Sequence, residues 1–441
     1  MIEGLEPYAE YKESGLSWLD RIPVGWDEQR SKYLFREVDR RSTSGEELRL
    51  SMSQRHGLIP SSNVEEKRLV SKTNIGAKIC EPGDLVLNRL KAHLGVFALA
   101  PRKGIVSPDY TVLRAIGSVN GLYFCTVYRS PYCGQELRRT AKGIVEGFWR
   151  LYTDQFYDIR VPVPPPNEQE AIVRFLDHAN RKIDGFIRAK RKLIGLLNEQ
   201  KQAIIHRAVT RGLDPNVPLK PSGIPWLGDI PKHWETRRLK QIAKMESGEN
   251  ITSVQIDEIG AYPVFGGNGL RGYTSRFTHD GTYALIGRQG ALCGNVNYAS
   301  GKFWASEHAV IPTLVRGVSV QWFGDLIRTM KLRQYSQSAA QPGLSVEMIG
   351  NLGIPYPTMI EQSEIAFAIE HQTGCMSTAI ARTEREIALM QEYRTRLTAD
   401  IVTGKLDVRD AAAMLPDTRE LGPTDEEVSM DDDDEQVNDS N

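Results

Sequence analysis

The sequence predicts two α/β domains joined by two long, paired helices, with an approximate internal twofold repeat. Three observations support this fold class. The chain has 441 residues, which is more than one ordinary domain holds. Two pairs of similar segments recur along it, and the second pair carries an apolar stripe at helical spacing. The stretches between these segments contain short runs of β-branched and aromatic residues, punctuated by glycine.

The repeat is strong at the ends of each half of the chain and absent in the middle. "SGLSWLDRIPVGW" begins at Ser14 and "SGIPWLGDIPKHW" begins at Ser222, 208 positions later. "VPVPPPNEQEAIVRFLDH" begins at Val161 and "IPYPTMIEQSEIAFAIEH" begins at Ile354, 193 positions later. Simple drift after a duplication should blur all parts alike. The pattern therefore indicates that the ends share one role and the middles have different roles.

The second pair of segments predicts two long helices. No proline lies between Glu168 and Val209, whereas the prolines at 162 and 164–166 mark the helix start. Apolar residues recur at steps of three and four, and a stripe this narrow needs a partner, for which the other copy is the obvious candidate. The predicted stripes are Ile172, Leu176, Ala179, Ile183, Phe186, Leu193, Leu197 and Ile204, and Ile365, Ile369, Met376, Ile380, Ile387, Met390, Leu397 and Ile401. Polar interruptions occur at Lys190, Gln200, Gln372 and Thr383.

The middles, about 36–160 and 244–353, show no evident similarity to each other and both look rich in strands. "DLVLNRL" and "GVFALA" in the first, and "YPVFGGNG", "GTYALIGRQG" and "NVNYASGKFW" in the second, are short β-like runs. A helix is expected after the strands in each middle, from "VNGLYFCTVYRSPYCGQELRRT" and "VQWFGDLIRTMKLRQYSQSA".

Composition excludes several classes of protein. No apolar run of about 18 residues occurs, so no membrane span is expected, and the first residues do not read as a signal peptide. The five cysteines are widely spaced without a CxxC, which fits reduced thiols in the cytoplasm and disfavours a disulfide frame or a zinc site.

Charge is unevenly distributed. The tail from Asp417 to Asn441 holds 11 acidic residues and one arginine, a net charge of −10, and it is expected to be disordered. Removing that charge from the chain's net −1 leaves about +9 on residues 1–416, which suits a polyanionic partner. Nine Lys or Arg lie between Arg181 and Arg211 in the first predicted helix. A solvated face, DNA phosphate and an acidic protein surface all remain open as their role.

Motifs that would indicate a catalytic centre are incomplete. Gly267, Gly269 and Gly272 form GxGxxG, but no helix follows and no acid lies near position 290, so the motif predicts a turn. "SPDY" at Ser107 lacks the second proline of the amino-methyltransferase loop, and Arg89 stands where a magnesium nuclease would need an acid. There is no Walker A motif, and the eight histidines form no metal-ligand pair. We therefore expect no catalytic residue and no metal site.

Polar and basic residues in glycine-rich turns of the two middles are candidate DNA contacts. Arg, Lys, Asn and Gln are the side chains that pair with guanine and adenine edges in the major groove. For each one, an ordinary surface role stays open. The candidates are Arg55, His56, Asn88, Arg89, Lys91 and Lys142 in the first middle, and Asn268, Arg271, Arg276, Arg288, Gln289 and Gln341 in the second.

The layout resembles the specificity subunit of Type I restriction–modification systems over about residues 1–410. The resemblance rests on the doubled opening segments, the doubled Pro-x-x-x-Glu-Gln helix starts, "GIVSPDY" up to Tyr110, and "QPGLS" from Gln341. The acidic tail departs from the pattern. The boundaries that follow are a target recognition domain at 1–160, a spacer helix at 161–213, a second recognition domain at 214–353, a second spacer helix at 354–410 and the tail at 411–441.

The resemblance implies the function and the partners. Each recognition domain would read one half of a split double-stranded DNA sequence, and the spacer helices would pair antiparallel and set the gap between the halves. The chain itself would be non-catalytic and bind no cofactor. Two modification subunits would supply S-adenosylmethionine and adenine methylation, and restriction subunits would supply cleavage that depends on ATP and magnesium. A cytoplasmic location is implied.

Two alternatives remain open at this point. The chain could be a stand-alone DNA-binding or DNA-mimicking protein without enzyme partners, which co-purification with methyltransferase chains would distinguish. It could also be an enzyme with an unfamiliar site, although no cluster of acids, histidines or phosphate-binding glycines supports this reading.

Overall fold

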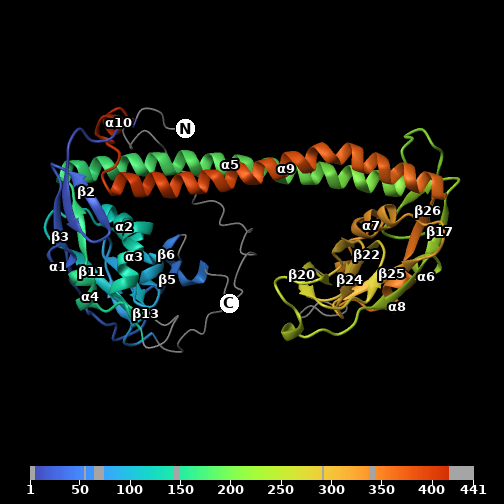
Figure 1. Cartoon of the computed structure of the whole chain (residues 1–441), viewed down its shortest axis with the longest axis horizontal. Helices are drawn as coiled ribbons and strands as arrows, with labels where there is room; N and C mark the ends of the chain where they lie inside the picture. Colours follow the sequence, from blue (N-terminus) through green and yellow to red (C-terminus); the bar gives the residue numbers. More distant parts are fainter. Residues whose placement is uncertain are drawn as a thin grey trace. The chain divides into compact units, whose positions relative to one another are not determined.

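The computed structural model describes residues 5–53, 56–63, 74–143, 149–290, 293–336 and 343–416. The chain divides into two compact units. Figure 1 colours the chain by residue number, so the residues of each unit can be followed there. Unit 1 combines residues 1–188 with 387–441, and unit 2 comprises residues 189–386. Each unit therefore contains most of one half of the sequence together with the end of the other half.

Each unit is built on a four-stranded antiparallel sheet with the same strand order. In unit 1 the order is β4 (Phe35–Glu37), β11 (Tyr110–Ala115), β8 (Leu85–Asn88) and β9 (Phe97–Leu99). In unit 2 it is β18 (Ala243–Ser247), β25 (Ala309–Leu314), β22 (Tyr283–Gly287) and β23 (Val296–Ala299). The predicted strands are confirmed, and two middles with no evident sequence similarity share one sheet topology.

A helix follows the strands in each unit, as predicted. Unit 1 has α2 (Gly121–Arg129) and α3 (Pro131–Thr140), and unit 2 has α7 (Val320–Thr329). Pro131 separates the first two, and the Ser130 hydroxyl accepts a hydrogen bond from the backbone N–H of Cys133 at the start of α3. In unit 2 the helix ends before Lys331, whose φ of 47° is left-handed, and a short 3₁₀ turn, η4 (Leu332–Tyr335), follows.

Short elements repeat around both sheets. Unit 1 has β1 (Tyr11–Leu16), β2 (Leu19–Pro23), β3 (Asp27–Arg30), α1 (Ser31–Leu34), α4 (Thr153–Asp158) and β14 (Arg160–Val163). Unit 2 has their counterparts β15 (Leu219–Pro221), β16 (Asp229–Pro231), β17 (Glu235–Arg238), α6 (Leu239–Ile242), α8 (Val346–Asn351) and β26 (Gly353–Tyr356). β3 pairs with β14, and β17 pairs with β26 in the same antiparallel way. The opening and closing segments of each half thus meet in a small sheet.

The remaining elements differ between the units. Unit 1 carries three small hairpins or ladders, β5 (Leu50–Ser53) with β6 (Gly57–Pro60), β7 (Lys78–Cys80) with β10 (Gly104–Val106), and β12 (Lys142–Gly143) with β13 (Trp149–Arg150), together with η1 (Ser61–Asn63) and η2 (Ala92–Leu94). Unit 2 carries a second sheet of β20 (Gly269–Thr274), β19 (Tyr262–Gly266), β24 (Lys302–Ala305) and β21 (His279–Asp280), with η3 (Ser253–Gln255). The decoration of the common sheet is therefore specific to each unit.

Two long helices correspond to the predicted spacer segments. α5 runs over Pro166–Arg211 and α9 over Met359–Val402, and they lie side by side in Figure 1. In unit 2, Lys190 pairs with Glu386 at 2.8 Å, and the Lys201 ammonium donates to the Ser377 hydroxyl at 2.8 Å. The residue number of the α9 partner decreases from 386 to 377 as that of the α5 partner increases from 190 to 201, so the two helices are antiparallel. The predicted fold class is confirmed.

The predicted apolar stripe is right along α9 but wrong in part along α5. The predicted members Phe186 and Leu193 are exposed, by 37% and 41%. Ile187 and Ile205 are buried instead. The reason is the spacing of the buried residues after Ile183. The next buried residue is four positions further on, at Ile187, and not three, at Phe186. On α9, Met390 and the other predicted positions are buried or half-buried.

Both long helices contribute to both hydrophobic cores. The core of unit 1 contains Ile172 and Leu176 from the start of α5, and Leu397 and Ile401 from the end of α9. The core of unit 2 contains the end of α5, with Val209, and the start of α9. Burying such side chains stabilises each core by about 1.5–3 kcal/mol per residue. The helix ends are therefore anchored by burial inside each unit.

The end of the chain returns to its beginning in unit 1. After α9, the backbone N–H of Asp407 donates to the carbonyl of Glu6 at 2.8 Å, and the Arg409 guanidinium lies 5.2 Å from the centre of the Tyr8 ring. The short helix α10 (Arg409–Ala413) follows. Among the described residues, no helix combines the length and apolar character that crossing a membrane requires.

Candidate nucleic-acid interface

The repeated segments meet through the same hydrogen bond in both units. The indole N–H of Trp26 donates to the Glu168 carboxylate at 2.8 Å in unit 1, and that of Trp234 donates to Glu361 at 3.1 Å in unit 2. Both tryptophans are almost fully buried. The repeated tryptophan of the opening segment and the repeated glutamate of the helix start are therefore partners.

The neighbouring repeated residues bind backbone atoms of the middles. Gln169 accepts from the backbone N–H of Asn120, which caps α2, and Gln362 accepts from the backbone N–H of Ser319, which caps α7. The Trp18 indole donates to the carbonyl of Arg160 at 3.2 Å. Its repeat partner donates to Gly353 at 3.1 Å. We call these eight residues the frame: Trp18, Trp26, Glu168 and Gln169, and Trp226, Trp234, Glu361 and Gln362.

The two frame glutamates have different further partners. Glu168 also accepts from the hydroxyl of Tyr8, and burial followed by this hydrogen bond raises the pKa of Tyr8 well above its usual range, so Tyr8 stays protonated. Glu361 instead accepts from His233 and from Thr358. Burial would raise the pKa of Glu361, but the hydrogen bonds from His233, Trp234 and Thr358 lower it overall.

We expect Trp26→Phe to destabilise the protein more than Trp234→Phe. The same indole N–H is lost from an equally buried site, but Glu168 is buried and keeps only the Tyr8 hydroxyl as a side-chain donor. The Glu361 side chain is 29% exposed and keeps three donors, from His233 and from the backbone and hydroxyl of Thr358. Leaving a buried carboxylate short of a donor costs about 1–3 kcal/mol. Urea unfolding followed by circular dichroism measures both losses. Equal losses would show that the hydrogen bond contributes little beyond packing.

Arg89 and Arg288 occupy equivalent positions in the two units. β8 ends with Asn88 opposite Tyr110, and β22 ends with Gly287 opposite Ala309, so each arginine directly follows the last ladder pair of its strand. The carbonyl of Arg89 accepts from the backbone N–H of Leu151 at 3.0 Å. That of Arg288 accepts from Leu344 at the same distance, 193 positions further on. Two of the sequence candidates thus occupy equivalent positions, one in each unit.

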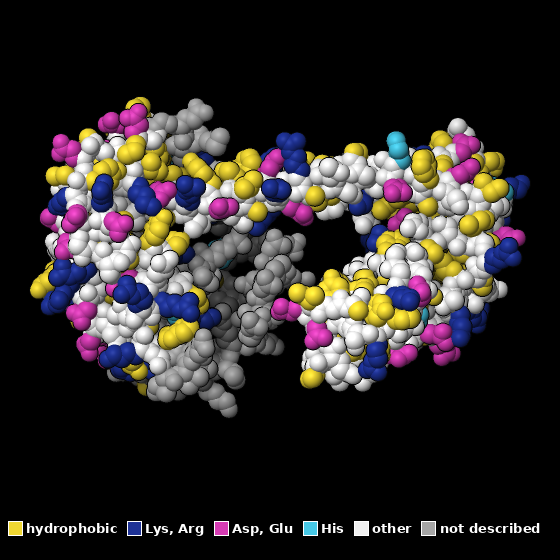
Figure 2. All heavy atoms as spheres, viewed as in Figure 1, with side chains coloured by type: hydrophobic (Ala, Val, Ile, Leu, Met, Phe, Trp, Pro, Cys, Tyr) yellow, Lys and Arg dark blue, Asp and Glu magenta, His cyan; other side chains and the backbone are white. Residues whose placement is uncertain are grey.

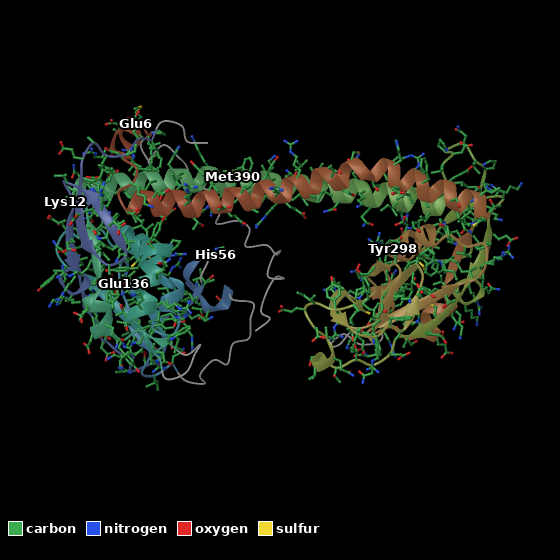
Figure 3. The ribbon with its side chains drawn as sticks, in the orientation of Figure 1. Glu6, Lys12, His56, Glu136, Tyr298 and Met390 are labelled. Carbon is green, nitrogen blue, oxygen red and sulfur yellow. The ribbon has the colours of Figure 1, made fainter. Side chains whose placement is uncertain are left out.

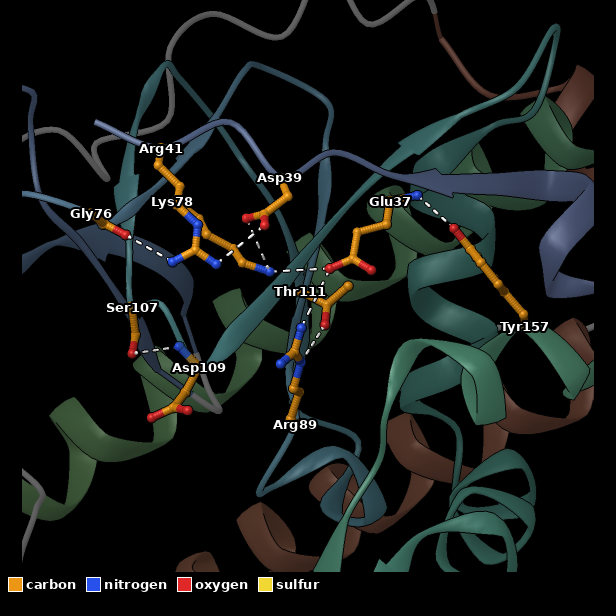
Figure 4. A network of polar contacts seen from close by, with 10 residues as sticks. All are labelled: Glu37, Asp39, Arg41, Gly76, Lys78, Arg89, Ser107, Asp109, Thr111 and Tyr157. Carbon is orange, nitrogen blue, oxygen red and sulfur yellow. Dashed lines mark hydrogen bonds and ion pairs between the residues drawn. The ribbon is translucent and has the colours of Figure 1, made fainter. Parts of the chain in front are cut away.

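In unit 1 the arginine side chain belongs to a network of polar contacts drawn in Figure 4. Arg89 Nε donates to the Thr111 hydroxyl at 2.7 Å, and Nη2 lies 3.4 Å from a Glu37 carboxylate oxygen. Lys78, only 2% exposed, is held 3.1 Å from Glu37 and 3.7 Å from Asp39. Buried charge of this kind is tolerated because it is paired on both sides.

In unit 2 the equivalent arginine is held by neutral groups. Arg288 Nη1 donates to the Ser247 hydroxyl at 2.8 Å, and Nε donates to the carbonyl of Leu344 at 3.3 Å. Its backbone N–H donates to the carbonyl of His308 at 2.8 Å. A Cβ on Gly267 would lie 2.9 Å from that carbonyl, so glycine is needed for this close approach.

The other candidates of unit 1 are spread more widely. The Asn88 side chain accepts from the backbone N–H groups of Leu90 and Lys91, so it supports the turn that contains them. His56, labelled in Figure 3, lies in the turn between β5 and β6, and Lys142 is exposed in β12. Arg55 lies outside the described residues.

Several candidates of unit 2 lie close to Arg288. The Arg271 side chain covers Gly266, where a Cβ would meet its Cδ at 2.6 Å. The Gln289 side-chain oxygen lies 3.0 Å from His308 Nδ1. Asn268 is exposed between β19 and β20. Arg276 lies 5.7 Å from the centre of the Trp304 ring, and Gln341 is outside the described residues.

Sequence reasoning missed residues that hold or accompany the candidates. Lys78, Thr111 and Ser247 lie on strands, and no local motif distinguishes them. His308 faces Gln289, a neighbour that only strand pairing reveals. Asn297 has a buried amide nitrogen without a hydrogen-bond partner among the described residues.

On one face of the molecule, basic side chains are dispersed rather than gathered. On the face shown in Figure 2, Lys and Arg lie among Asp and Glu over both units. Part of the basic run of α5 is paired with carboxylates of the same chain, since Arg181 lies 2.7 Å from Asp177 and Lys190 lies 2.8 Å from Glu386. Within the described ranges, no three His, Cys, Asp or Glu are grouped as a metal site would need.

Comparisons with known proteins agree with the arrangement. The family model for the Type I restriction modification DNA specificity domain matches residues 231–379. The Type I restriction enzyme EcoprrI specificity subunit of Escherichia coli is 40% identical over 153 residues, 34% of this chain and 38% of that protein. The MjaVIII specificity subunit of Methanocaldococcus jannaschii is 28% identical over 120 residues, 25% of this chain and 27% of that protein.

A solved structure reported on the complex assembly and conformational transition of the type I R-M system has a similar fold. Its TM-score is 0.63 at 16% sequence identity, covering 87% of this chain and 99% of that one. The matched stretches of the two curated relatives, by contrast, span well under two thirds of their lengths. These similarities show that residues 231–379 match the Type I restriction modification DNA specificity domain and that the chain shares the fold of the solved structure.

Proposed function

We propose that this chain is a DNA specificity subunit that recognises a bipartite target, one half with each unit. The observation that carries the proposal is the contrast between the frame, whose Trp–Glu and backbone hydrogen bonds are repeated, and the strand-end surfaces, which differ. Repeated segments held by the same internal contacts suit one kind of partner bound twice. Two different surfaces on a common sheet suit two different half-sites.

The backbone contacts of the frame support this division of roles. Gln169 and Gln362 bind backbone N–H groups, and Trp18 and Trp226 bind backbone carbonyls. Every residue except proline offers both groups, so the middles can change sequence without losing these bonds. The frame can therefore stay constant while the recognition surface diverges.

Enzymatic chemistry is assigned to the partners in this proposal. Two modification subunits dock on the repeated opening and closing segments, which the frame holds together, and supply S-adenosylmethionine and adenine methylation. Restriction subunits join them and supply ATP- and magnesium-dependent cleavage. This chain contributes the DNA sequence that the complex selects, and no cofactor.

Reconstitution tests the proposal. The purified chain alone is expected to transfer no methyl group to DNA, whereas the chain co-expressed with modification subunits is expected to direct methylation to a split motif. Methylation-aware sequencing of the host genome reads out the motif. Methyl transfer by the chain alone, or DNA binding without any co-purifying methyltransferase subunit, would contradict the proposal and favour an enzyme or a stand-alone DNA-binding protein.

DNA affinity is expected to fall steeply with salt, because Lys and Arg that contact phosphates release counterions. The tail after Pro416, with its net charge of −10, should compete with DNA for these groups. A chain truncated after Pro416 is therefore expected to bind non-specific DNA more tightly than the full chain at low salt. Fluorescence anisotropy across a salt series measures both effects. Identical affinities would show that the tail does not compete.

A further inference from the structure

We propose that Arg89 and Arg288 are equivalent base-reading residues, one for each half-site, and that each half of the target carries a guanine that its arginine contacts. The inference rests on the proposed function and deepens it. Its starting point is a coincidence of position: two middles without evident sequence similarity place an arginine at the same strand end. Both arginines also have the same backbone partner, a leucine just before α4 or α8.

The position is repeated although its surroundings are not. The strands read "LVLNR" before and including Arg89, and "ALIGR" before and including Arg288. The groups that hold the two side chains are chemically different, a hydroxyl and a carboxylate in unit 1 and a hydroxyl and a carbonyl in unit 2. An arginine needed only for one packing arrangement has no reason to appear in both.

Each guanidinium is held in place by two nitrogens, and its other terminal nitrogen has no acceptor within the described part of the chain. Arg89 is tied through Nε and Nη2, and Arg288 through Nε and Nη1. Within the described part of the chain, no acceptor is bonded to Nη1 of Arg89 or to Nη2 of Arg288. A planar fork already fixed in orientation loses little freedom on binding, and its two outer nitrogens match guanine O6 and N7.

The charges around Arg89 leave it positive toward a ligand. Glu37, which contacts Arg89, is also paired with the buried Lys78. Arg89 is linked through Glu37 and Asp39 to two further cations, Arg41 and Lys78, so this group holds three cations and two carboxylates, a net charge of +1. The third carboxylate in Figure 4, Asp109, pairs with Arg150 at 3.7 Å. Lys78 therefore offsets the carboxylate that would otherwise cancel the arginine.

The experiment uses the full chain co-expressed with modification subunits, with Arg89→Lys and Arg288→Lys as variants. Lysine keeps the charge but cannot form the two-pronged contact. Arg89→Lys is expected to reduce discrimination at one G·C pair in one half-site by roughly 10- to 100-fold, and Arg288→Lys at one pair in the other half-site. Methylation-aware sequencing measures both. The matched controls are Arg36→Lys and Arg316→Lys, which change exposed arginines of the same units and should leave the motif unchanged.

Thr111→Val separates positioning from contact. It removes the hydroxyl that holds Arg89 Nε but keeps the arginine, so it should weaken discrimination at the same base pair and less than Arg89→Lys does. A merely structural role of Thr111 would lower the thermal midpoint without changing any base preference. This variant also serves if Arg89→Lys does not fold.

The outcomes distinguish this inference from the proposed function. A wild-type complex that methylates no split motif contradicts the proposed function itself. A split motif in which either half lacks a G·C pair overturns the inference and leaves the function standing. So does a lysine variant with an unchanged motif, or one that lowers methylation equally at all sites, because the arginine would then be structural or bind phosphate.

Discussion

Replacing residues 36–160 with the corresponding segment of another family member is expected to change one half of the methylated motif completely and to leave the other half intact. The exchanged segment starts at Arg36, one residue after β4 begins at Phe35. It ends at Arg160, the first residue of β14. The frame contacts that cross these borders use backbone atoms of the segment, at Asn120 and Arg160, so a foreign sequence can make them. Methylation-aware sequencing with modification subunits present reads out both halves.

The matching exchange of residues 244–353 is the control, and it should change only the other half of the motif. Its border contacts are the equivalent ones, to the backbone of Ser319 and Gly353. If either exchange altered both halves together, the two units would not read DNA independently. A chimera that unfolds would be recognised by circular dichroism and would require another donor segment.

Inserting seven residues into each long helix is expected to lengthen the gap between the half-sites while leaving both half-sites unchanged. The insertions belong opposite each other, after Gly195 in α5 and after Arg382 in α9, because Lys190 faces Glu386 and Lys201 faces Ser377. Seven residues restore the apolar face and add about 10 Å at about 1.5 Å per residue. That length equals about three base pairs at about 3.4 Å each.

Activity should fall even where the longer gap is accepted. Three base pairs turn the second half-site by roughly 100°, since a turn of DNA holds about 10 to 10.5 base pairs, and this twist must be absorbed. Inserting two residues in each helix instead rotates the following face by about 200°. The apolar stripe on one side of the insertions then no longer continues on the same helix face as the stripe on the other side, so pairing of the two helices should fail. An active seven-residue variant with an unchanged gap would exclude the helices as its determinant.

Local order was predictable from the sequence. The prolines before Glu168 and the lack of any afterwards placed the start of α5 within two residues, because proline cannot donate the helical hydrogen bond. Glycine-bounded β-like runs predicted β8, β9 and β22. The face of a long helix that is buried was harder to predict, and the stripe was misplaced after Ile183. Each step between apolar residues can be three or four residues, and an error at one step shifts every later position.

By itself the sequence determined that the chain consists of two halves with common ends and different middles, each ending in a long helix. Only the tertiary structure decided which repeated residues bind each other, Trp26 with Glu168 and Trp234 with Glu361. It alone revealed that the middles share a sheet order and that Arg89 and Arg288 coincide. The physical reason is that helices and turns depend on neighbours in sequence. Strand order and hydrogen bonds between distant segments depend on how distant strands pair. A sheet accepts many apolar sequences in the same strand register, so the sequence alone does not specify the pairing.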